Sequence, residues 1–219
     1  MGTFGLVEAT LDGMNYWRHS EYHYFVHLSG QCYPIKPLTT IREELRRSEA
    51  AYMESFKLPS KVHWTDENGG LDRINYNHFR LWKWRIRIPR LNRTLPYNLE
   101  PYGGSHYFCL TKRCVDYVLD YLPEHPEIIS FFRRSRIPEE MFFQTIIMNS
   151  PLRSEVVNEH KRYFRWEKGG GHPSVLRKTD FKELVESDKW IAKKFDIDID
   201  KDILDLLDRA IEHWPLDSG

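Results

Sequence analysis

Apolar residues recur along the chain at two spacings, one typical of helices and one typical of strands. A helix is predicted close to the N-terminus from four apolar residues that share one face: Leu6, Val7, Leu11 and Met14. The dense apolar run at 22–28 predicts a buried strand. A second helix is predicted over 41–52, because Thr40 and Glu43 have the spacing of a capping box.

Residues 80–88 alternate between apolar and charged positions, which predicts a strand with one charged face. The basic residues on and beside this face are Arg80, Lys83, Arg85, Arg87 and Arg90. Such a face is usually solvated, and the alternative is a groove for an anionic ligand. Further strands are predicted at 106–110 and 163–166, with helices that begin near Thr111, residue 128, Pro138, Thr179 and Asp200. Because strands alternate with helices, the predicted fold class is α/β.

The composition fits one sizeable domain over residues 1–219, with 41% apolar residues to supply a core. Lys+Arg and Asp+Glu both number 32, which argues against a nucleic-acid partner, since such binders normally carry a basic excess. Cys32, Cys109 and Cys114 have neither zinc-site nor disulfide spacing, so small core residues in a reducing compartment are predicted. No apolar run approaches the roughly 20 residues that span a bilayer, and the N-terminus lacks a signal-peptide pattern.

Two adjacent carboxylates stand where a helix is predicted to begin, in Pro138-Glu139-Glu140. Proline suits a first helical position, and acidic side chains are favoured near a helix N-terminus, so both glutamates could simply complement the helix dipole. Apolar residues follow directly: Met141, Phe142, Ile146 and Ile147. Alternatively, therefore, one carboxylate is a general base held against an apolar wall, and burial there would raise its pKa.

Several short segments occur in an order that is typical of one enzyme family. They are FGLVEAT (4–10), LSGQCYPIK (28–36), GSHYF (104–108), PEE (138–140), RW (165–166) and AKKFD (192–196). Over residues 4–208 the chain resembles the core-2/I-branching β-1,6-N-acetylglucosaminyltransferase family, which includes the peptide O-xylosyltransferases. The resemblance implies a GT-A-like α/β fold. It also implies that this copy is N-terminally truncated, because the family's earlier segment, which contacts the uridine, precedes the helix at which this chain starts.

The resemblance implies an inverting, metal-independent transfer of N-acetylglucosamine or xylose from a UDP-sugar to an acceptor hydroxyl on a glycan or protein. Glu140 matches the family's catalytic base, and Glu139 is left as the helix-terminal acid. Lys194, directly before Phe-Asp, matches a basic residue that binds the diphosphate in place of a metal. Arg177 stands in the order of its partner arginine, although the intervening stretch is shorter here. For both cations the alternative is an ordinary solvated side chain.

Further site residues follow from the same resemblance. Ser29 and Gly30 are assigned to the nucleotide, because ligands bind at strand ends in open α/β sheets, and the alternative is a plain turn. Trp166 matches a tryptophan that contacts the acceptor sugar, with core packing as the alternative. Arg73 and Ser105 are also assigned to the acceptor.

Two sequence features complicate the assignment. Cys32 stands where the family usually has an aspartate. Asp196 and Asp198 form an Asp-x-Asp pattern, the metal-binding signature of many GT-A enzymes, but they precede the last predicted helix. Asp200 is therefore predicted to cap that helix, and no metal ligand or other cofactor is assigned.

Three functions are weighed. The leading one is the glycosyltransferase, with a UDP-sugar donor and a glycan or glycoprotein acceptor. The second is a non-catalytic remnant that binds glycans through Trp166 and Arg73. A glycoside hydrolase would need two carboxylates that flank the sugar, and Glu139 and Glu140 would point in different directions on a helix. The resemblance implies a cytoplasmic or membrane-associated location, or the Golgi in a eukaryote.

Overall fold

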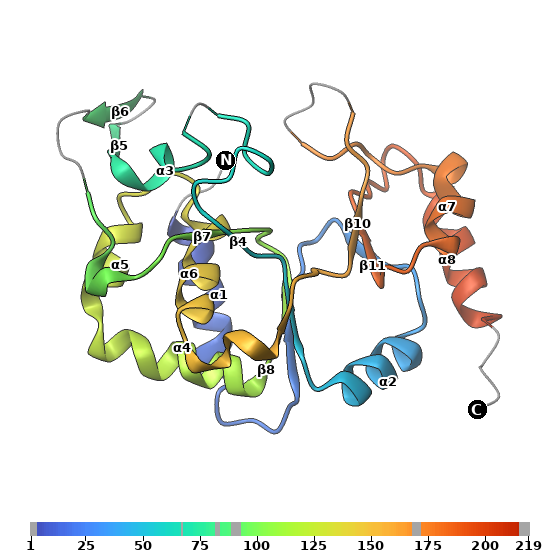
Figure 1. Ribbon diagram of the computed structural model, residues 1–219. Coiled ribbons are helices and arrows are strands. Elements are labelled where there is room, and N and C mark those ends of the chain that lie inside the picture. The colour runs from blue at the N-terminus through green and yellow to red at the C-terminus, as the bar shows by residue number, and fades with distance from the viewer. Residues whose placement is uncertain (1–3, 67, 82–83, 89–92, 168–171, 215–219) are drawn as a thin grey trace. The chain divides into compact units, whose positions relative to one another are not determined.

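The computed structural model divides into two units, each with its own hydrophobic core (Figure 1). Unit 1 comprises residues 1–27 and 50–160, and unit 2 comprises residues 28–49 and 161–219. The structure describes residues 4–66, 68–81, 84–88, 93–167 and 172–214, without the side chains of 79–92. Helices and short strands alternate in both units, which confirms the predicted α/β class.

A four-stranded sheet lies at the centre of unit 1, in the order β1-β8-β3-β9. Its strands are β1 (Tyr24–Val26), β8 (Phe108–Thr111), β3 (Ala51–Met53) and β9 (Val156–Val157). β8 pairs antiparallel with β1 and β3, whereas β3 pairs parallel with β9. Every residue of β3 and β8 is buried, so these two strands run through the core.

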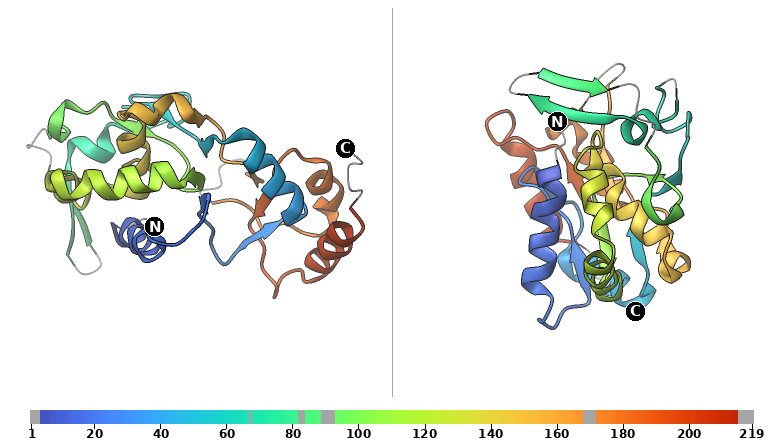
Figure 2. Two further views of the ribbon diagram at one scale, coloured as in Figure 1. Left: turned by 90° about the horizontal axis from the view of Figure 1, so that it is seen from below. Right: turned by 90° about the vertical axis from the view of Figure 1, so that its left-hand side faces the viewer.

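Four helices pack on this core: α1 (Phe4–Trp17), α4 (Lys112–Glu124), α5 (Pro126–Phe132) and α6 (Phe142–Met148). Figure 2 shows α1 and α4 side by side, and α4 also contacts α5 and α6. The ring of Phe142 meets Phe4 and Phe132 edge to face. The predicted start of α4 is confirmed, because the Thr111 side chain accepts a hydrogen bond from the Cys114 N–H at 3.3 Å.

Smaller elements surround the unit 1 core. β4 (Phe56–Lys57) pairs antiparallel with β7 (Tyr102–Gly103), and β5 (Asn77–Leu81) pairs antiparallel with β6 (Trp84–Ile88). The remaining elements are α3 (Asp72–Asn75) and the 3-10 turns η1 (Pro96–Asn98), η2 (Pro138–Glu140) and η3 (Pro151–Glu155). Figure 1 shows the β5–β6 hairpin at the same end of unit 1 as α3.

Unit 2 is built on a three-stranded sheet in the order β10-β11-β2. β11 (Ile191–Lys193) pairs parallel with β10 (Arg162–Phe164) and antiparallel with β2 (Cys32–Pro34). The helical elements are α2 (Leu38–Ser48), η4 (Lys178–Asp180), α7 (Phe181–Glu186) and α8 (Asp202–Glu212). The buried apolar residues of its core are Ile35, Leu176, Leu184, Ala192, Phe195, Ile203 and Leu207.

Three local predictions are wrong. The run over 80–88 is not one strand, because Leu81 in β5 pairs antiparallel with Trp84 in β6 and the alternating pattern carries no mark of the boundary between them. The basic face predicted there lies outside the described side chains. The Thr40–Glu43 capping box does not form, because α2 already begins at Leu38 with Pro37 as its N-cap. The same helix ends at Ser48, where Glu49 turns left-handed, so Tyr52 lies in β3.

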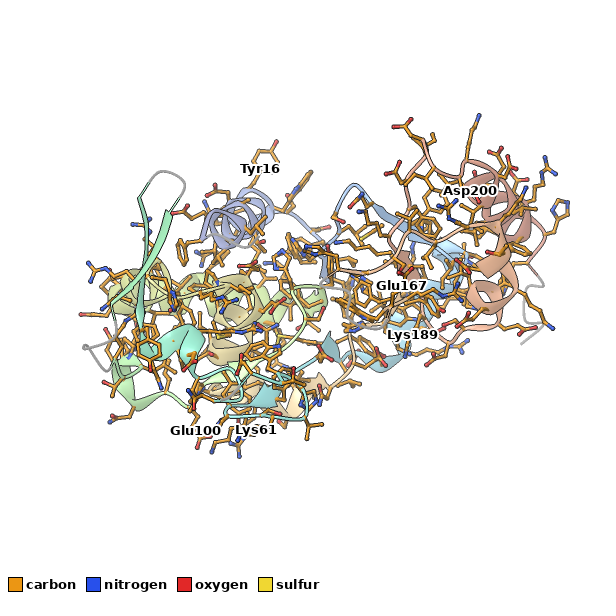
Figure 3. The ribbon with its side chains drawn as sticks, turned by 90° about the horizontal axis from the view of Figure 1, so that it is seen from above. Tyr16, Lys61, Glu100, Glu167, Lys189 and Asp200 are labelled. Atoms are coloured by element: carbon orange, nitrogen blue, oxygen red, sulfur yellow. The ribbon has the colours of Figure 1, made fainter. Side chains whose placement is uncertain are left out.

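The apolar face of α1 also differs from the prediction at one position. Phe4, Val7, Thr10 and Met14 are buried, but Leu6 is 45% exposed. Figure 3 shows the side chain of Tyr16, another exposed apolar residue, directed away from α1. The face of α1 that packs on the core is therefore formed by Phe4, Val7, Thr10 and Met14.

The three cysteines are free thiols. Cys109 and Cys114 are buried, as predicted, and burial raises the pKa of Cys114, whereas Cys32 is half-buried. None of the helices in the described part of the chain is long and apolar enough to cross a membrane.

Candidate functional site

Glu140 and Arg73 form an ion pair in unit 1. Nη1 of Arg73 donates to Oε2 of Glu140 at 2.6 Å, and the side chains are 13% and 35% exposed for Arg73 and Glu140 respectively. Backbone contacts hold both residues. The Glu140 carbonyl accepts from the Gly104 N–H at 2.9 Å, and the Arg73 carbonyl accepts from the Arg136 N–H at 2.8 Å. The structure thus brings a half-exposed carboxylate and a nearly buried cation together from positions far apart in the sequence.

An indole ring also contacts the Arg73 guanidinium. Its Cζ atom is 3.5 Å from the centroid of the Trp64 ring, close enough for a cation–π interaction. The backbone around the ring carries glycine at two points of close approach, Gly70 and Gly103. A Cβ atom at either position would overlap the Trp64 ring. Sequence reasoning did not find Trp64, although Gly69-Gly70 and Gly103-Gly104 were visible signs of tight backbone packing.

Glu54 and Ser105 belong to the same region of unit 1. Burial raises the pKa of Glu54, while the nearby His63 and a hydrogen bond from the Ser105 backbone lower it. The charge of Glu140 acts on Glu54 as well and raises its pKa. Ser105 is held by a 2.7 Å bond from Nε2 of Gln144 to its carbonyl. Glu54 was missed from the sequence, and the available signal was its place directly after the buried strand β3.

Glu139, predicted to be the helix-terminal acid, lies in the first turn of η2 and is buried. The residue is 5% exposed, and its Oε2 atom is buried without a hydrogen-bond partner among the described residues. Desolvation by this burial raises the pKa of Glu139 to about 7. The burial of Glu139 is consistent with the local backbone, because η2 is a 3-10 turn that ends at Met141 before α6 begins. The four apolar residues that follow the glutamates, Met141, Phe142, Ile146 and Ile147, are all buried.

The four residues assigned to the nucleotide all lie in unit 2. Backbone bonds join their segments: the Leu176 N–H donates to the Lys194 carbonyl at 2.8 Å, and the Phe195 N–H donates to the Gln31 carbonyl at 3.0 Å. The exposed Arg177 and the half-buried Lys194 therefore stand on adjoining segments.

Ser29 and Gly30 form the turn before β2. The Cys32 N–H donates to the Ser29 carbonyl at 3.0 Å, and Oγ of Ser29 lies 3.3 Å from Sγ of Cys32. Gly30 is exposed, with no atom within 4 Å of the position that a Cβ would take. A ligand could approach this backbone without steric hindrance.

Trp166 is 59% exposed, so the alternative of core packing is wrong for this residue. It follows β10, and its ring centroid is 6.4 Å from that of Phe164. The preceding Arg165 forms ion pairs with Asp180 and Glu183, which anchor the end of the strand to η4 and α7. An exposed indole on an anchored strand end presents a flat apolar face, as a sugar-binding residue requires.

The aspartates before α8 serve local structure. The Asp196 carboxylate accepts from the Asp198 N–H at 3.1 Å. The predicted capping role of Asp200 is confirmed, because its carboxylate accepts from the N–H groups of Ile203 at 3.3 Å and Lys178 at 2.9 Å. Within the described ranges, no group of three or more His, Cys, Asp or Glu residues is placed to hold a metal ion.

Comparison with known proteins matches most of the chain to one family. The family model described as "Branch: Core-2/I-Branching enzyme" matches residues 1–188, which include the Glu140–Arg73 pair, Ser105, Trp166 and Arg177. The chain belongs to the core-2/I-branching enzyme family. Lys194 lies beyond the matched residues.

Individual relatives match the chain at about a quarter sequence identity. The chain is 26% identical over 211 residues to xylosyltransferase 2 of Rattus norvegicus, which covers 84% of this chain. It is 25% identical over 207 residues to xylosyltransferase 1 of Homo sapiens, again over 84% of this chain. The matches span only 23% and 20% of those two relatives, so the chain corresponds to about a fifth to a quarter of their length.

Proposed function

We propose that this core-2/I-branching family member is an inverting, metal-independent glycosyltransferase with a GT-A-like fold. It moves xylose or N-acetylglucosamine from a UDP-sugar to an acceptor hydroxyl on a glycan or protein. The ion pair between Glu140 and Arg73 is the observation that carries the proposal. The ion pair fixes the position of the Glu140 carboxylate, and 35% of the side chain is open to an acceptor.

In the proposed reaction, the acceptor oxygen forms a bond to the anomeric carbon as the bond from that carbon to the UDP oxygen breaks. Glu140 takes the proton of the acceptor hydroxyl, and the electron pair of the broken bond leaves with UDP. Attack from the side opposite UDP inverts the anomeric centre. General base catalysis of this kind contributes typically about 10²–10⁴-fold. Lys194 and Arg177 are the cations that we assign to the charge on the departing diphosphate.

Xylose is the donor sugar to test first, because both relatives described above carry the name xylosyltransferase. N-acetylglucosamine is the second donor, since the family takes its name from core-2/I-branching enzymes. Trp166 is the residue that we assign to the acceptor sugar, because an exposed aromatic face suits the C–H surface of a pyranose.

The first experiment is calorimetric titration of UDP into the chain with a chelator present. Binding is expected, and it would justify assays with UDP-xylose and UDP-N-acetylglucosamine against a panel of glycan and peptide acceptors. In those assays Glu140→Gln should abolish transfer while it leaves UDP binding unchanged. The matched control is Glu43→Gln, which alters an exposed glutamate on α2 and should change neither. Full transfer activity in Glu140→Gln would overturn the mechanism.

The second candidate function is glycan binding without transfer. It is favoured by the 59% exposure of Trp166, which a binding module would use as readily as an enzyme. A wild-type chain that binds glycan, fails to bind UDP and transfers neither sugar would support this alternative. Loss of glycan binding in Trp166→Ala would then place the binding face.

A further inference from the structure

We propose that Trp64 is a positioning residue, which holds the Arg73 guanidinium in the one orientation that binds the Glu140 carboxylate. The inference deepens the proposed function and rests on it, because Glu140 is the proposed base. Nothing in the local sequence connects these residues. The structure connects them through two successive contacts: the Trp64 indole contacts the Arg73 guanidinium, and the guanidinium bonds the Glu140 carboxylate.

The protein backbone is shaped around the Trp64 ring. Gly70 has a φ of +89°, a conformation that side-chain-bearing residues rarely adopt, and a Cβ there would overlap the six-membered part of the indole. Gly103 in β7 approaches the same ring, and a Cβ there would also lie only 3.0 Å from the Phe56 ring. Two glycines at two separate chain positions thus leave the space that the Trp64 ring occupies.

The segment that carries Trp64 is closed upon itself. The Trp64 N–H donates to the Ser60 carbonyl at 2.9 Å, and the Ser60 N–H donates to the Gly69 carbonyl at 2.9 Å. Phe56 meets the indole edge to face, with ring centroids 5.1 Å apart. The ring is therefore fixed by its own loop and by β4, and it does not depend on Arg73 for its position.

Arginine needs such a support more than most residues. Its long side chain loses much rotamer entropy when it is held in one geometry. At Arg73 a hydrogen bond to one oxygen fixes only one end of the guanidinium plane. Stacking on the indole fixes the plane itself, since the cation is attracted to the ring face. A fixed guanidinium in turn orients the Glu140 carboxylate before the acceptor arrives, which is the condition for efficient proton transfer.

The clamp can be tested without any assay of transfer, by nuclear magnetic resonance of the chain labelled at the arginine guanidinium nitrogens. In the wild type, rotation of the Arg73 guanidinium should be slow and its Nη resonances resolved, with the Arg73→Lys spectrum supplying the assignment. Trp64→Leu should collapse those resonances, and Trp64→Phe, which keeps a smaller ring, should give an intermediate exchange rate. Trp17→Leu is the matched control, because it removes an exposed tryptophan from α1 of the same unit.

A second variant covers the case in which Trp64→Leu does not fold. Gly70→Ala keeps the indole but pushes it out of its slot, so it should free the Arg73 guanidinium in the same way. Resolved, slowly exchanging Arg73 resonances in every folded variant at position 64 or 70 would overturn the proposal.

Kinetics then connect the clamp to the base. If transfer is observed, Trp64→Leu should lower kcat by about 10-fold with little change in the KM for UDP-sugar. In an Arg73→Lys background the same substitution should cost less than about 2-fold, because it acts through the guanidinium. Equal losses in both backgrounds would show that Trp64 acts independently of Arg73 and would overturn the proposal. If the wild type transfers no sugar, the proposed function fails, and the resonance experiment still decides whether the clamp exists.

Discussion

Glu139 and Glu140 are neighbours in the chain, but their carboxylates lie in opposite environments. Glu140 is half-exposed and bonded to Arg73 at 2.6 Å, whereas Glu139 is 5% exposed with a buried, unpartnered Oε2 atom among the described residues. Burial disfavours the charged form of Glu139 and raises its pKa, whereas the Glu140 carboxylate faces a bonded cation. Glu140 therefore has a proposed chemical role, whereas the buried Glu139 lowers the stability of the fold when it is charged.

The first prediction concerns that cost. The pKa of Glu139 is raised to about 7 from an ordinary value of 4.5, chiefly by desolvation. Between these values the folded chain binds more protons at Glu139 than the unfolded chain, so stability falls as pH rises. Glu139→Gln, which is neutral at every pH, should raise the free energy of unfolding by about 1–3 kcal/mol at about pH 8 and by much less at about pH 5. Urea titrations at the two pH values measure the difference.

The exposed Glu43 supplies the control for this experiment. Glu43→Gln should change stability by less than about 0.5 kcal/mol at either pH, as is usual for surface substitutions. An equal gain from Glu139→Gln at both pH values would mean that the gain does not come from removal of a buried charge.

The second prediction separates the charge of Arg73 from its shape. Arg73→Lys keeps a cation beside Glu140 but loses the planar group that stacks on Trp64. Transfer should fall by about 10–100-fold, while UDP binding measured by calorimetry stays the same. The matched control is Arg113→Lys, since the exposed Arg113 pairs with Glu155 at 3.0 Å and this substitution should leave both quantities unaltered. Wild-type turnover in Arg73→Lys would show that a point charge suffices at this position.

Secondary structure could be predicted from the sequence where a local signal acts alone. The cap of α4 at Thr111 and the cap of α8 by Asp200 are examples, since a short polar side chain satisfies an N–H two or three residues ahead. The prediction failed where tertiary pairing decides. Tyr52 looks helical by spacing but pairs with Cys109 in the central sheet, and the alternating run at 80–88 gives no sign that the chain reverses within it.

The candidate site shows the same division. The resemblance of short motifs pointed to Glu140 and Arg73, but no periodicity could predict that these two residues pair across 67 positions or that Trp64, 9 positions before Arg73, joins them. Nor could the sequence show which of the two glutamates is buried. Which glutamate is buried depends on the 3-10 geometry of η2. This turn ends at Met141, so the helical phase of α6 does not extend back to Glu139 and Glu140.

The third prediction concerns the link that Asp200 makes in unit 2. Its carboxylate bonds the N–H groups of Lys178 in η4 and Ile203 in α8, so Asp200→Ala should lower the free energy of unfolding by about 1–2 kcal/mol. The Lys178 hydrogen bond is the main cause that lowers the pKa of Asp200 below its ordinary 3.8. A lowered pKa means that this stability is present at neutral pH and is lost as pH falls through the folded value. Denaturation curves for the two proteins should therefore converge in acid.

Asp198→Ala is the control for the third prediction, because Asp198 is exposed in the same turn and its N–H, not its carboxylate, makes the bond to Asp196. It should change stability by less than about 0.5 kcal/mol. A loss as large as that of Asp200→Ala would indicate that negative charge near α8, and not the two hydrogen bonds, stabilises the turn.

The last prediction contrasts two glycines of unit 1. A Cβ at Gly104 would overlap the Glu54 carbonyl oxygen, a backbone atom that cannot rotate away, and Gly104 also donates to the Glu140 carbonyl. Gly104→Ala should therefore cost at least about 2 kcal/mol of stability. It should also reduce transfer in the folded fraction, since it moves the backbone that carries the Glu54 and Glu140 carboxylates. At Gly13, inside α1, the nearest atoms belong to the Phe25 ring at an ordinary 3.8 Å, so Gly13→Ala should stabilise by about 0.5–1 kcal/mol. Thermal unfolding of both variants measures the contrast. A tolerated Gly104→Ala with full activity would show that the backbone beside Glu140 can shift, which is incompatible with a base held rigidly in place.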